Sequence, residues 1–310
     1  MNRVSLLLAL TAAAACSAPP SPPAAAPSVA SPAASAPRVN AELLVSTAWL
    51  ADHLQDPGVV VLHVARERAA YDAGHLPGAR FLPLGAIVTE RDGLPNELPG
   101  VAQLDSVFES VGVSDDVRVV LYGELGGLAA GRAFFTLDYL GHLRVALLDG
   151  GLEAWQAEGR ALATGATPTP ARGQFTPRPQ SERLVTAAWV REHADDAGMV
   201  LIDARPPAEY RGTEPGAGVA RPGHIPGGQN IFWRSALVSA EQPLLREVEE
   251  LRELYRAAGA RPGTTVVTYC RTGVQASHAY FVARYLGFDT RMYDGSFIDW
   301  SRRPELPVAR

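Results

Sequence analysis

The sequence predicts an α/β protein with two domains, each a mostly parallel sheet covered by helices on both faces. Short apolar strands alternate with helical stretches along the chain, as in parallel sheets with crossover helices. The globular part, roughly 270 residues, is longer than one typical domain. Motifs also recur at a spacing of about 140 to 150 residues, which predicts two copies of one fold.

The repeated motifs occur in the same order in both halves. The clearest pair is Gly-His-Leu-Pro-Gly at 74–78 and Gly-His-Ile-Pro-Gly at 223–227. The other pairs are 45–50 with 185–190, 59–64 with 199–202, 119–122 with 266–269, 135–141 with 281–287, and 149–155 with 294–300. Ordered matches of this length are not expected by chance, so each half is predicted to be a domain.

Residues 1–16 have the features of a bacterial secretion signal. Arg3 precedes an apolar core, and small residues then lead to Cys16. The segment is too short for a stable transmembrane anchor. Its end resembles a lipoprotein signal with Cys16 as the lipidated residue, and an ordinary signal cleaved nearby is the alternative. We therefore expect an exported, periplasmic protein held by lipid at the outer membrane.

The remaining boundaries follow from composition and from the repeat. Residues 17–40 are nearly all Ala, Pro and Ser, which cannot bury a core, so we expect a disordered tether there. The expected first domain is 41–163, the linker is 164–183 and the second domain is 184–310. In the second domain the expected strands are 200–204, 264–269 and 291–294, and the expected helices are 187–194, 244–258 and 276–286.

Composition excludes several function classes. The chain is 47% hydrophobic and 20% charged, with a net charge of −5, so no basic surplus indicates nucleic-acid binding. All 28 basic residues are arginine, which excludes a lysine Schiff base. Beyond Cys16 the one cysteine is Cys270, so we expect a reactive thiol and no internal disulfide. No metal-ligand cluster is visible, and we expect no metal and no cofactor.

The segment 265–277 is the centre of the predicted site. A β-branched apolar strand ends at Cys270, a glycine-containing loop follows, and a helix begins near Ala276. Unpaired N–H groups at a helix N-terminus stabilise an anion, so we expect this thiol to ionise more readily than a free one. The predicted anion-binding groups are Arg271 and the loop residues Thr272, Gly273, Val274 and Gln275. The alternative is a buried structural cysteine.

These motifs resemble the rhodanese family in its tandem two-domain form. The resemblance covers about Leu43 to the C-terminus, and it rests on the segments 270–275, 223–227 and 293–296 with Trp300. It implies two tandem rhodanese-like domains, the second with the cysteine in a cleft between the domains, and the first inactive. The counterpart of the cysteine loop in the first domain is 123–127, which holds Glu124 and no thiol and is one residue longer.

The resemblance implies sulfur transfer by covalent catalysis in two half-reactions. A Cys270 thiolate takes the sulfane sulfur of a donor as a persulfide, and cyanide or a thiol acceptor removes it. The loop N–H groups stabilise the negative charge, as in an oxyanion hole. Arg271 with Thr272 favours thiosulfate as the donor, and 3-mercaptopyruvate is the alternative. The implied partners are therefore small molecules.

One position departs from the family pattern. Many members carry a substrate-binding arginine shortly after an Asp-x-Arg motif, which here is Asp203-Ala204-Arg205. The later position is Glu209, which would repel an anion if it faced the site. Glu209 can instead pair with Arg271, and Arg211 or Arg221 can take the place of the missing arginine.

Several other side chains have both a functional and a structural interpretation. Asp203 and Arg205 either position the cysteine loop or form a structural ion pair, and we favour the ion pair. His224 is expected to be a hydrogen-bonding turn residue rather than a base, because its twin His75 persists where no cysteine does. Ser277 is expected to cap the helix or donate to the loop.

Two further residues and two further function classes complete the predictions. Asp294 has a twin in Asp149 and is expected to be structural, whereas Trp233 has no twin and either packs in the core or lines the cleft. A cysteine-dependent phosphatase would need an arginine six residues after Cys270, where the chain has Ala276. A non-catalytic sulfur carrier or interaction module is an alternative because of Glu209.

Overall fold

The computed structural model describes Met1 and residues 38–165, 167 and 169–310. Apart from Met1, the predicted signal with Cys16 lies outside the described residues, and so does nearly all of the predicted tether. From residue 38 onward the described chain belongs to one compact unit. Within the described part of the chain, no helix is both long and apolar enough to cross a membrane.

Each half of this unit contains a parallel five-stranded sheet. The first has the order β1 (Leu44–Val45), β7 (Val145–Leu148), β6 (Arg118–Tyr122), β2 (Val59–Ala65) and β3 (Arg80–Pro83). The second has the order β8 (Leu184–Val185), β12 (Asp289–Tyr293), β11 (Thr265–Tyr269), β9 (Met199–Asp203) and β10 (Gln229–Asn230). The two orders are equivalent, which confirms the predicted repeat and the α/β class.

Both faces of each sheet are buried, and alternate residues of a strand serve different cores. In β2, Val60 and Leu62 belong to a large core that is shared by the two halves, whereas Val61 packs in a smaller core on the outer face. In β11, Val266 lies in the shared core and Val267 in the outer core of the second domain. Burial on both faces explains why these strands are continuous apolar runs in the sequence.

Helices cover both faces of each sheet, as predicted. Those of the first domain are α1 (Thr47–His53), α2 (Arg68–Ala73), α3 (Val101–Ser110), α4 (Leu128–Tyr139) and α5 (Gly151–Ala157). Those of the second domain are α6 (Ala187–His193), α7 (Pro207–Tyr210), α8 (Val248–Ala257), α9 (Val274–Tyr285) and α10 (Ser296–Arg302). The Ser46 and Thr186 hydroxyls accept hydrogen bonds from the N–H groups of Trp49 and Trp189, and so cap α1 and α6 in the same way.

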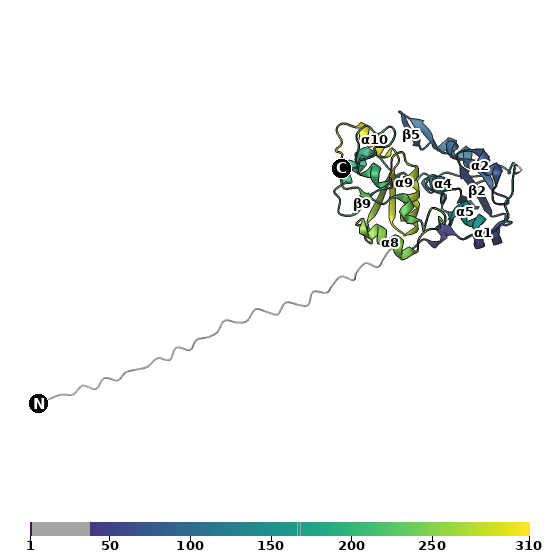
Figure 1. The fold of residues 1–310 in the computed structure, drawn as a ribbon, viewed down its shortest axis with the longest axis horizontal. Helices are drawn as coiled ribbons and strands as arrows, with labels where there is room; N and C mark the ends of the chain where they lie inside the picture. The colour runs from purple at the N-terminus through teal and green to yellow at the C-terminus, as the bar shows by residue number, and fades with distance from the viewer. Residues whose placement is uncertain (2–37, 166, 168) are drawn as a thin grey trace. The chain divides into compact units, whose positions relative to one another are not determined.

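The helices α4 and α9 pack against each other between the two sheets (Figure 1). They approach closely at Gly131, where an added Cβ would lie 3.0 Å from the Cα of His278. Beside this point, Phe134 meets Phe281 and Phe135 meets Tyr280, each pair edge to face with ring centroids 5.0 Å apart. These contacts join the two domains through one core, so the cysteine at the start of α9 lies beside the first domain.

A hairpin of the first domain was not predicted from the sequence. It consists of β4 (Thr89–Arg91) and β5 (Leu94–Glu97), joined by Asp92 and Gly93. Both joining residues have positive φ, 53° and 72°, which matches the turn that Asp-Gly favours in two-residue hairpins. The guanidinium of Arg302 on α10 donates to the carbonyl of Gly93 at 2.8 Å, so the hairpin tip is held by the second domain.

Three predicted element boundaries are wrong by a few residues. The helix predicted from 276 is α9, which begins at Val274, and the strand predicted from 291 is β12, which begins at Asp289. The helix predicted from 244 is α8, which begins at Val248, because Leu245 instead forms a β-bridge with Leu237.

Candidate active site

Cys270 lies at the end of the central strand of the second sheet and in front of helix α9. The strand β11 is hydrogen-bonded on both sides, by β9 and β12, so its C-terminal end is fixed. The loop 270–273 then turns into α9 through Gly273, which has a φ of 91°. This is the strand–loop–helix arrangement that the sequence predicted, and it places the thiol at the N-terminus of a 12-residue helix.

The thiol is buried and receives backbone hydrogen bonds. Cys270 is 1% exposed, and the N–H of Gly273 donates to its Sγ at 3.1 Å. Burial raises the pKa of the Cys270 thiol, while the N–H groups of Ala276, Thr272, Gly273 and Gln275 act in the opposite direction. The expected easier ionisation is therefore wrong for the resting site, because the desolvation of the thiolate outweighs the N–H groups. The predicted cradle of N–H groups is present.

Hydrogen bonds from α9 and α10 hold the loop on its inner side. The N–H of Cys270 donates to the Ser296 hydroxyl at 3.2 Å, and the Cys270 carbonyl accepts from the N–H of Phe297 at 2.9 Å. The Ser277 hydroxyl donates to the carbonyl of Gly273 at 2.9 Å, which is one of the two roles predicted for it. These hydrogen bonds hold the loop backbone, and with it the N–H groups that face Sγ, in one position.

Arg271 does not present a free charge to the site. Its Nη1 lies 3.3 Å from Oε1 of Glu209, and the two side chains are 37% and 15% exposed. Burial raises the pKa of Glu209, and the positive charge of Arg271 lowers it. The structure therefore shows the pairing that the sequence suggested, and an anion that uses Arg271 must compete with Glu209.

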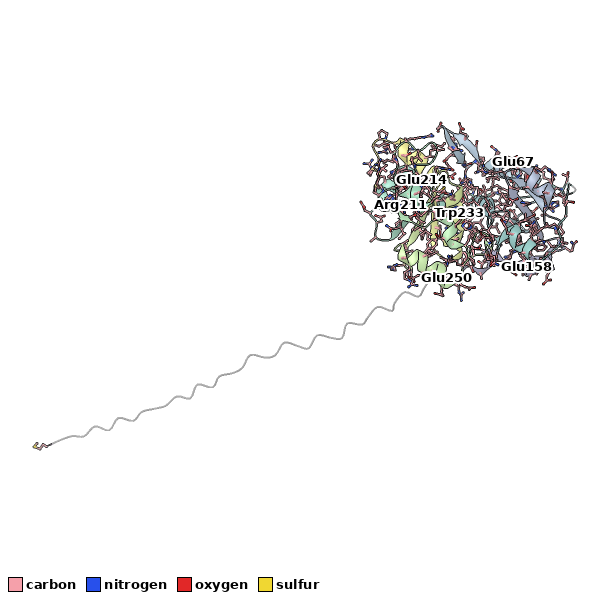
Figure 2. All side chains as sticks on the ribbon, in the orientation of Figure 1. Glu67, Glu158, Arg211, Glu214, Trp233 and Glu250 are labelled. Carbon is pink, nitrogen blue, oxygen red and sulfur yellow. The ribbon has the colours of Figure 1, made fainter. Side chains whose placement is uncertain are left out.

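The two arginines considered as replacements have different surroundings. Arg221 donates to the carbonyls of Trp300, Ser301, Arg303 and Leu306, so it fastens the C-terminal segment with four hydrogen bonds. Arg211 is exposed (Figure 2). Of the two, Arg211 is therefore the more accessible to an anion.

Asp203 and Arg205 form a buried ion pair, as favoured from the sequence. Both side chains are fully buried, and Arg205 Nη2 lies 2.5 Å from Asp203 Oδ2. Arg205 also donates to the carbonyl of Gly223 at 2.8 Å and lies 4.1 Å from the ring centre of Phe297. The N–H of Phe297 donates to the Cys270 carbonyl. The ion pair therefore contacts the cysteine loop indirectly, through Phe297.

Two aromatic candidates are structural. Nδ1 of His224 lies 3.0 Å from the carbonyl of Tyr210, and the His224 ring stacks on the Tyr210 ring at 3.9 Å. The His224 side chain therefore joins its turn to the end of α7. Trp233 is 3% exposed and packs edge to face on His278 at 5.3 Å, so it belongs to the core and does not line an open cleft.

The corresponding loop of the first domain has a carboxylate instead of the thiol. Oε1 of Glu124 lies 3.2 Å from Nε2 of the buried His63, and this hydrogen bond lowers the pKa of Glu124. The loop is 123–127, one residue longer than 270–273, and Leu125 adopts a positive φ of 56° within it. In this loop the N–H of Leu125 donates to the carboxylate of Glu153 at 2.6 Å, so a side chain of the protein occupies a donor of the loop.

A cavity of ≈290 Å³ lies beside this loop and reaches the second domain at Val274. Its lining is Ala65, Arg66, Glu67, Ala70, Leu84, Glu124, Leu125, Leu128, Ala129 and Val274. Val274 is the first residue of α9 and follows Gly273. The first domain thus forms a largely apolar wall next to the cysteine loop, which agrees with the role of cleft wall predicted for it.

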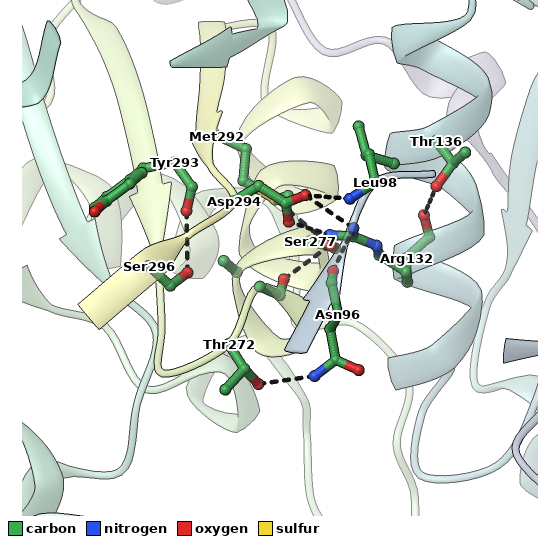
Figure 3. A network of polar contacts seen from close by, with 12 residues as sticks. Asn96, Leu98, Arg132, Thr136, Thr272, Ser277, Met292, Tyr293, Asp294 and Ser296 are labelled. Atoms are coloured by element: carbon green, nitrogen blue, oxygen red, sulfur yellow. Dashed lines mark hydrogen bonds and ion pairs between the residues drawn. The ribbon is translucent and has the colours of Figure 1, made fainter. Parts of the chain in front are cut away.

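The sequence did not predict Asn96 and Arg132, two of the first-domain residues that bind the cysteine loop or Asp294 next to it. Nδ2 of Asn96 donates to the Thr272 hydroxyl at 3.1 Å, and Arg132 forms a buried ion pair with Asp294 (Figure 3). The available signals were an Asp-Gly turn just before Asn96 and a single arginine within the apolar helix 128–139. Asp294, which was expected to be structural, is thus the partner of Arg132 in this ion pair.

Comparisons with known proteins agree with this geometry. The chain is 36% identical to the "Sulfur carrier protein TtuD" of Thermus thermophilus, over 87% of this chain and 97% of that protein. It is 32% identical to a thiosulfate sulfurtransferase of Pseudomonas aeruginosa (86% and 96% covered) and 30% identical to a 3-mercaptopyruvate sulfurtransferase of Escherichia coli (85% and 96% covered).

A solved structure shares the fold across both domains. A variant of EanB in complex with ergothioneine superimposes with a TM-score of 0.78 at 25% identity, covering 86% of this chain and 70% of that one. The family model for the rhodanese-like domain matches twice, at residues 46–158 and 186–303. The protein therefore belongs to the rhodanese family, with two rhodanese-like domains in tandem.

Proposed function

We propose that the protein is a thiosulfate sulfurtransferase whose nucleophile is Cys270. Proteins of this family move sulfane sulfur through a cysteine persulfide. In the first half-reaction the Cys270 thiolate attacks the outer sulfur of thiosulfate. A new S–S bond forms to Sγ, the S–S bond of thiosulfate breaks, and sulfite leaves with the electron pair. In the second, cyanide or a thiolate attacks the outer sulfur of the persulfide, and Sγ leaves as a thiolate.

The observation that carries this proposal is the position of the sulfur at the start of α9. The N–H of Gly273 already donates to Sγ at 3.1 Å, and the N–H groups of Thr272, Gln275 and Ala276 also favour the thiolate. Negative charge sits on Sγ before attack and returns to it when the acceptor takes the sulfur. Fixed donors stabilise this charge without reorganising, which is what an oxyanion hole does.

The choice of thiosulfate rests on the cation beside the thiol. Arg271 is the residue after the nucleophile, and displacement of Glu209 would let its guanidinium bind a dianionic donor. Relatives of both donor classes are similar to this chain, so the test compares the donors directly. Sulfite release from thiosulfate and pyruvate release from 3-mercaptopyruvate are measured with cyanide as acceptor. Higher kcat/KM for thiosulfate supports the proposal, and higher kcat/KM for 3-mercaptopyruvate contradicts the donor assignment.

A second candidate function is that of a sulfur carrier. The pairing of Arg271 with Glu209 favours it, because it lowers the positive potential at the mouth of the site. A relative 36% identical to this chain is also named a sulfur carrier protein. A carrier would form the persulfide in one turnover and then release sulfur slowly to cyanide. A single-turnover burst of sulfite followed by a negligible steady state would favour this second function.

We also propose, from the sequence, that the protein is exported and lipidated at Cys16. The support is the apolar segment before Cys16 and the Ala/Pro/Ser-rich segment after it. Fractionation of cells expressing the full chain tests this proposal. The wild type should be found in the membrane fraction with an acylated N-terminal peptide, and Cys16→Ser should lack the acyl group. Absence of acylation in the wild type would contradict it.

A further inference from the structure

Residues of the first domain contact the cysteine loop at several points. The hairpin β4–β5 lies on the second domain, with its tip held by Arg302 as described above. In its second strand, Asn96 donates from Nδ2 to the Thr272 hydroxyl at 3.1 Å. The next contact is at Leu98, whose N–H donates to Oδ2 of Asp294 at 2.9 Å. Asn96 in β5 and Leu98 just after it thus bind the loop after Cys270 and the residue after β12.

A buried ion pair connects helix α4 of the first domain to the same place. Nη1 of Arg132 lies 2.5 Å from Oδ1 of Asp294, and Nη2 lies 3.0 Å from Oδ2. Arg132 is fully buried and Asp294 is 3% exposed. Nη2 also donates to the carbonyl of Asn96 at 2.7 Å, so one guanidinium joins helix, hairpin and second domain (Figure 3).

The ion pair lies directly against the residue that bonds the sulfur. A Cβ added to Gly273 would lie 2.6 Å from Oδ1 of Asp294 and 3.1 Å from Nη1 of Arg132. The N–H of Gly273 is the donor to Sγ of Cys270. The position of this N–H therefore depends on where the ion pair holds the Gly273 backbone.

The repeat shows that the charge is not a general requirement of the interface. Arg132 is the fifth residue of α4, and His278 is the fifth residue of α9. Burial lowers the pKa of His278 to about 4, so this counterpart is neutral near pH 7. A buried ion pair contributes little net stability compared with apolar packing. At this repeated position, the helix that faces the cysteine loop thus carries a charged residue, and its counterpart in the other helix is neutral.

We propose that the β4–β5 hairpin and Arg132 of the first domain are positioning elements that hold the Cys270 loop in its reactive conformation. The Asn96 amide holds the loop by its hydrogen bond to Thr272, and the ion pair of Arg132 with Asp294 holds it by lying against Gly273. The domain without a cysteine is then a working part of the site. The proposal rests on the proposed role of Cys270 as nucleophile, and its test is designed to separate the two.

The first test removes the contact between Asn96 and Thr272. Asn96 has a positive φ of 63°, so Asn96→Gly deletes the amide and keeps the backbone conformation. The matched control is Asn40→Gly, because the Asn40 amide donates across the same domain interface to the Arg284 carbonyl at 2.7 Å. The readouts are the pH profile of Cys270 alkylation by iodoacetamide, followed by intact mass, and kcat and KM with thiosulfate and cyanide.

We expect Asn96→Gly to lower kcat about fivefold, the worth of one neutral hydrogen bond, with KM nearly unchanged. We also expect its alkylation profile to move to higher pH, because the N–H groups are less well aligned with Sγ. Asn40→Gly should match the wild type in both readouts. Wild-type behaviour of Asn96→Gly, or equal changes in both variants, would overturn the proposal. Alkylation needs no sulfur donor, so this arm decides even if no sulfur transfer is found.

The second test addresses the ion pair. Arg132→Met alone would leave Asp294 buried and unpaired, so we pair it with Asp294→Asn to remove both charges. The double variant should show the same upward shift of the alkylation profile and a lower kcat. A folded double variant with the wild-type profile would contradict the role of Arg132. Should the double variant not fold, the Asn96→Gly arm decides the proposal.

Discussion

Glu209→Gln is the substitution that tests the electrostatics of the site most sharply. In the structure Glu209 competes with any anion for Arg271, across 3.3 Å between side chains that are 15% and 37% exposed. Pairs this accessible to solvent are worth about 1 kcal/mol at most, which corresponds to about a fivefold change in binding. Glutamine keeps the shape and removes the charge. We therefore expect KM for thiosulfate to fall up to about fivefold, with kcat nearly unchanged.

The assay is steady-state thiocyanate formation at several ionic strengths. The advantage of Glu209→Gln should shrink as salt rises, because screening weakens the competing ion pair. The matched control is Glu214→Gln, an exposed carboxylate near Glu209 in sequence that should change KM little (Figure 2). An unchanged or higher KM in Glu209→Gln would show that Arg271 does not receive the donor, and would refute the electrostatic reasoning.

The remaining predictions concern the thiol, the first domain and the core. Cys270→Ser should abolish sulfur transfer, and activity near wild type in the same assay would exclude the mechanism. The alkylation rate of Cys270 should rise with pH without levelling off near neutrality, since burial raises the pKa of the thiol; a plateau at acidic pH would contradict this. Glu124→Ala should keep kcat within about twofold, which a large loss in a folded variant would disprove. Asp203→Asn should destabilise the protein by about 3–5 kcal/mol, visible as a lower Tm, because Arg205 stays buried without its partner; an unchanged Tm would count against that pair.

The fold was largely predictable because the same pattern of motifs occurs in both halves of the chain. Strands such as β2 and β11 are apolar on both faces, and that pattern survives in the sequence as continuous runs. The boundaries that failed depend on contacts outside the element. Leu245 was predicted to be helical but forms a β-bridge with Leu237. Its N–H donates to Asp149 at 2.9 Å across the domain interface.

The cysteine loop could be predicted because its function lies in consecutive residues. The surroundings of the loop could not, since Arg132 and Asp294 are 162 positions apart and meet only when the domains pack. The prediction that Cys270 ionises more readily than a free thiol was wrong for a related reason. The sequence shows the helix N-terminus that favours a thiolate, whereas the burial that disfavours it comes from the folded whole.

The most direct test of the central claim is the intact mass of the purified two-domain unit, residues 38–310, after incubation with thiosulfate. We predict a gain of one sulfur atom that maps to the peptide containing Cys270, is removed by cyanide with release of thiocyanate, and is absent in Cys270→Ser. No gain of sulfur, or a gain that persists in Cys270→Ser, would contradict the account.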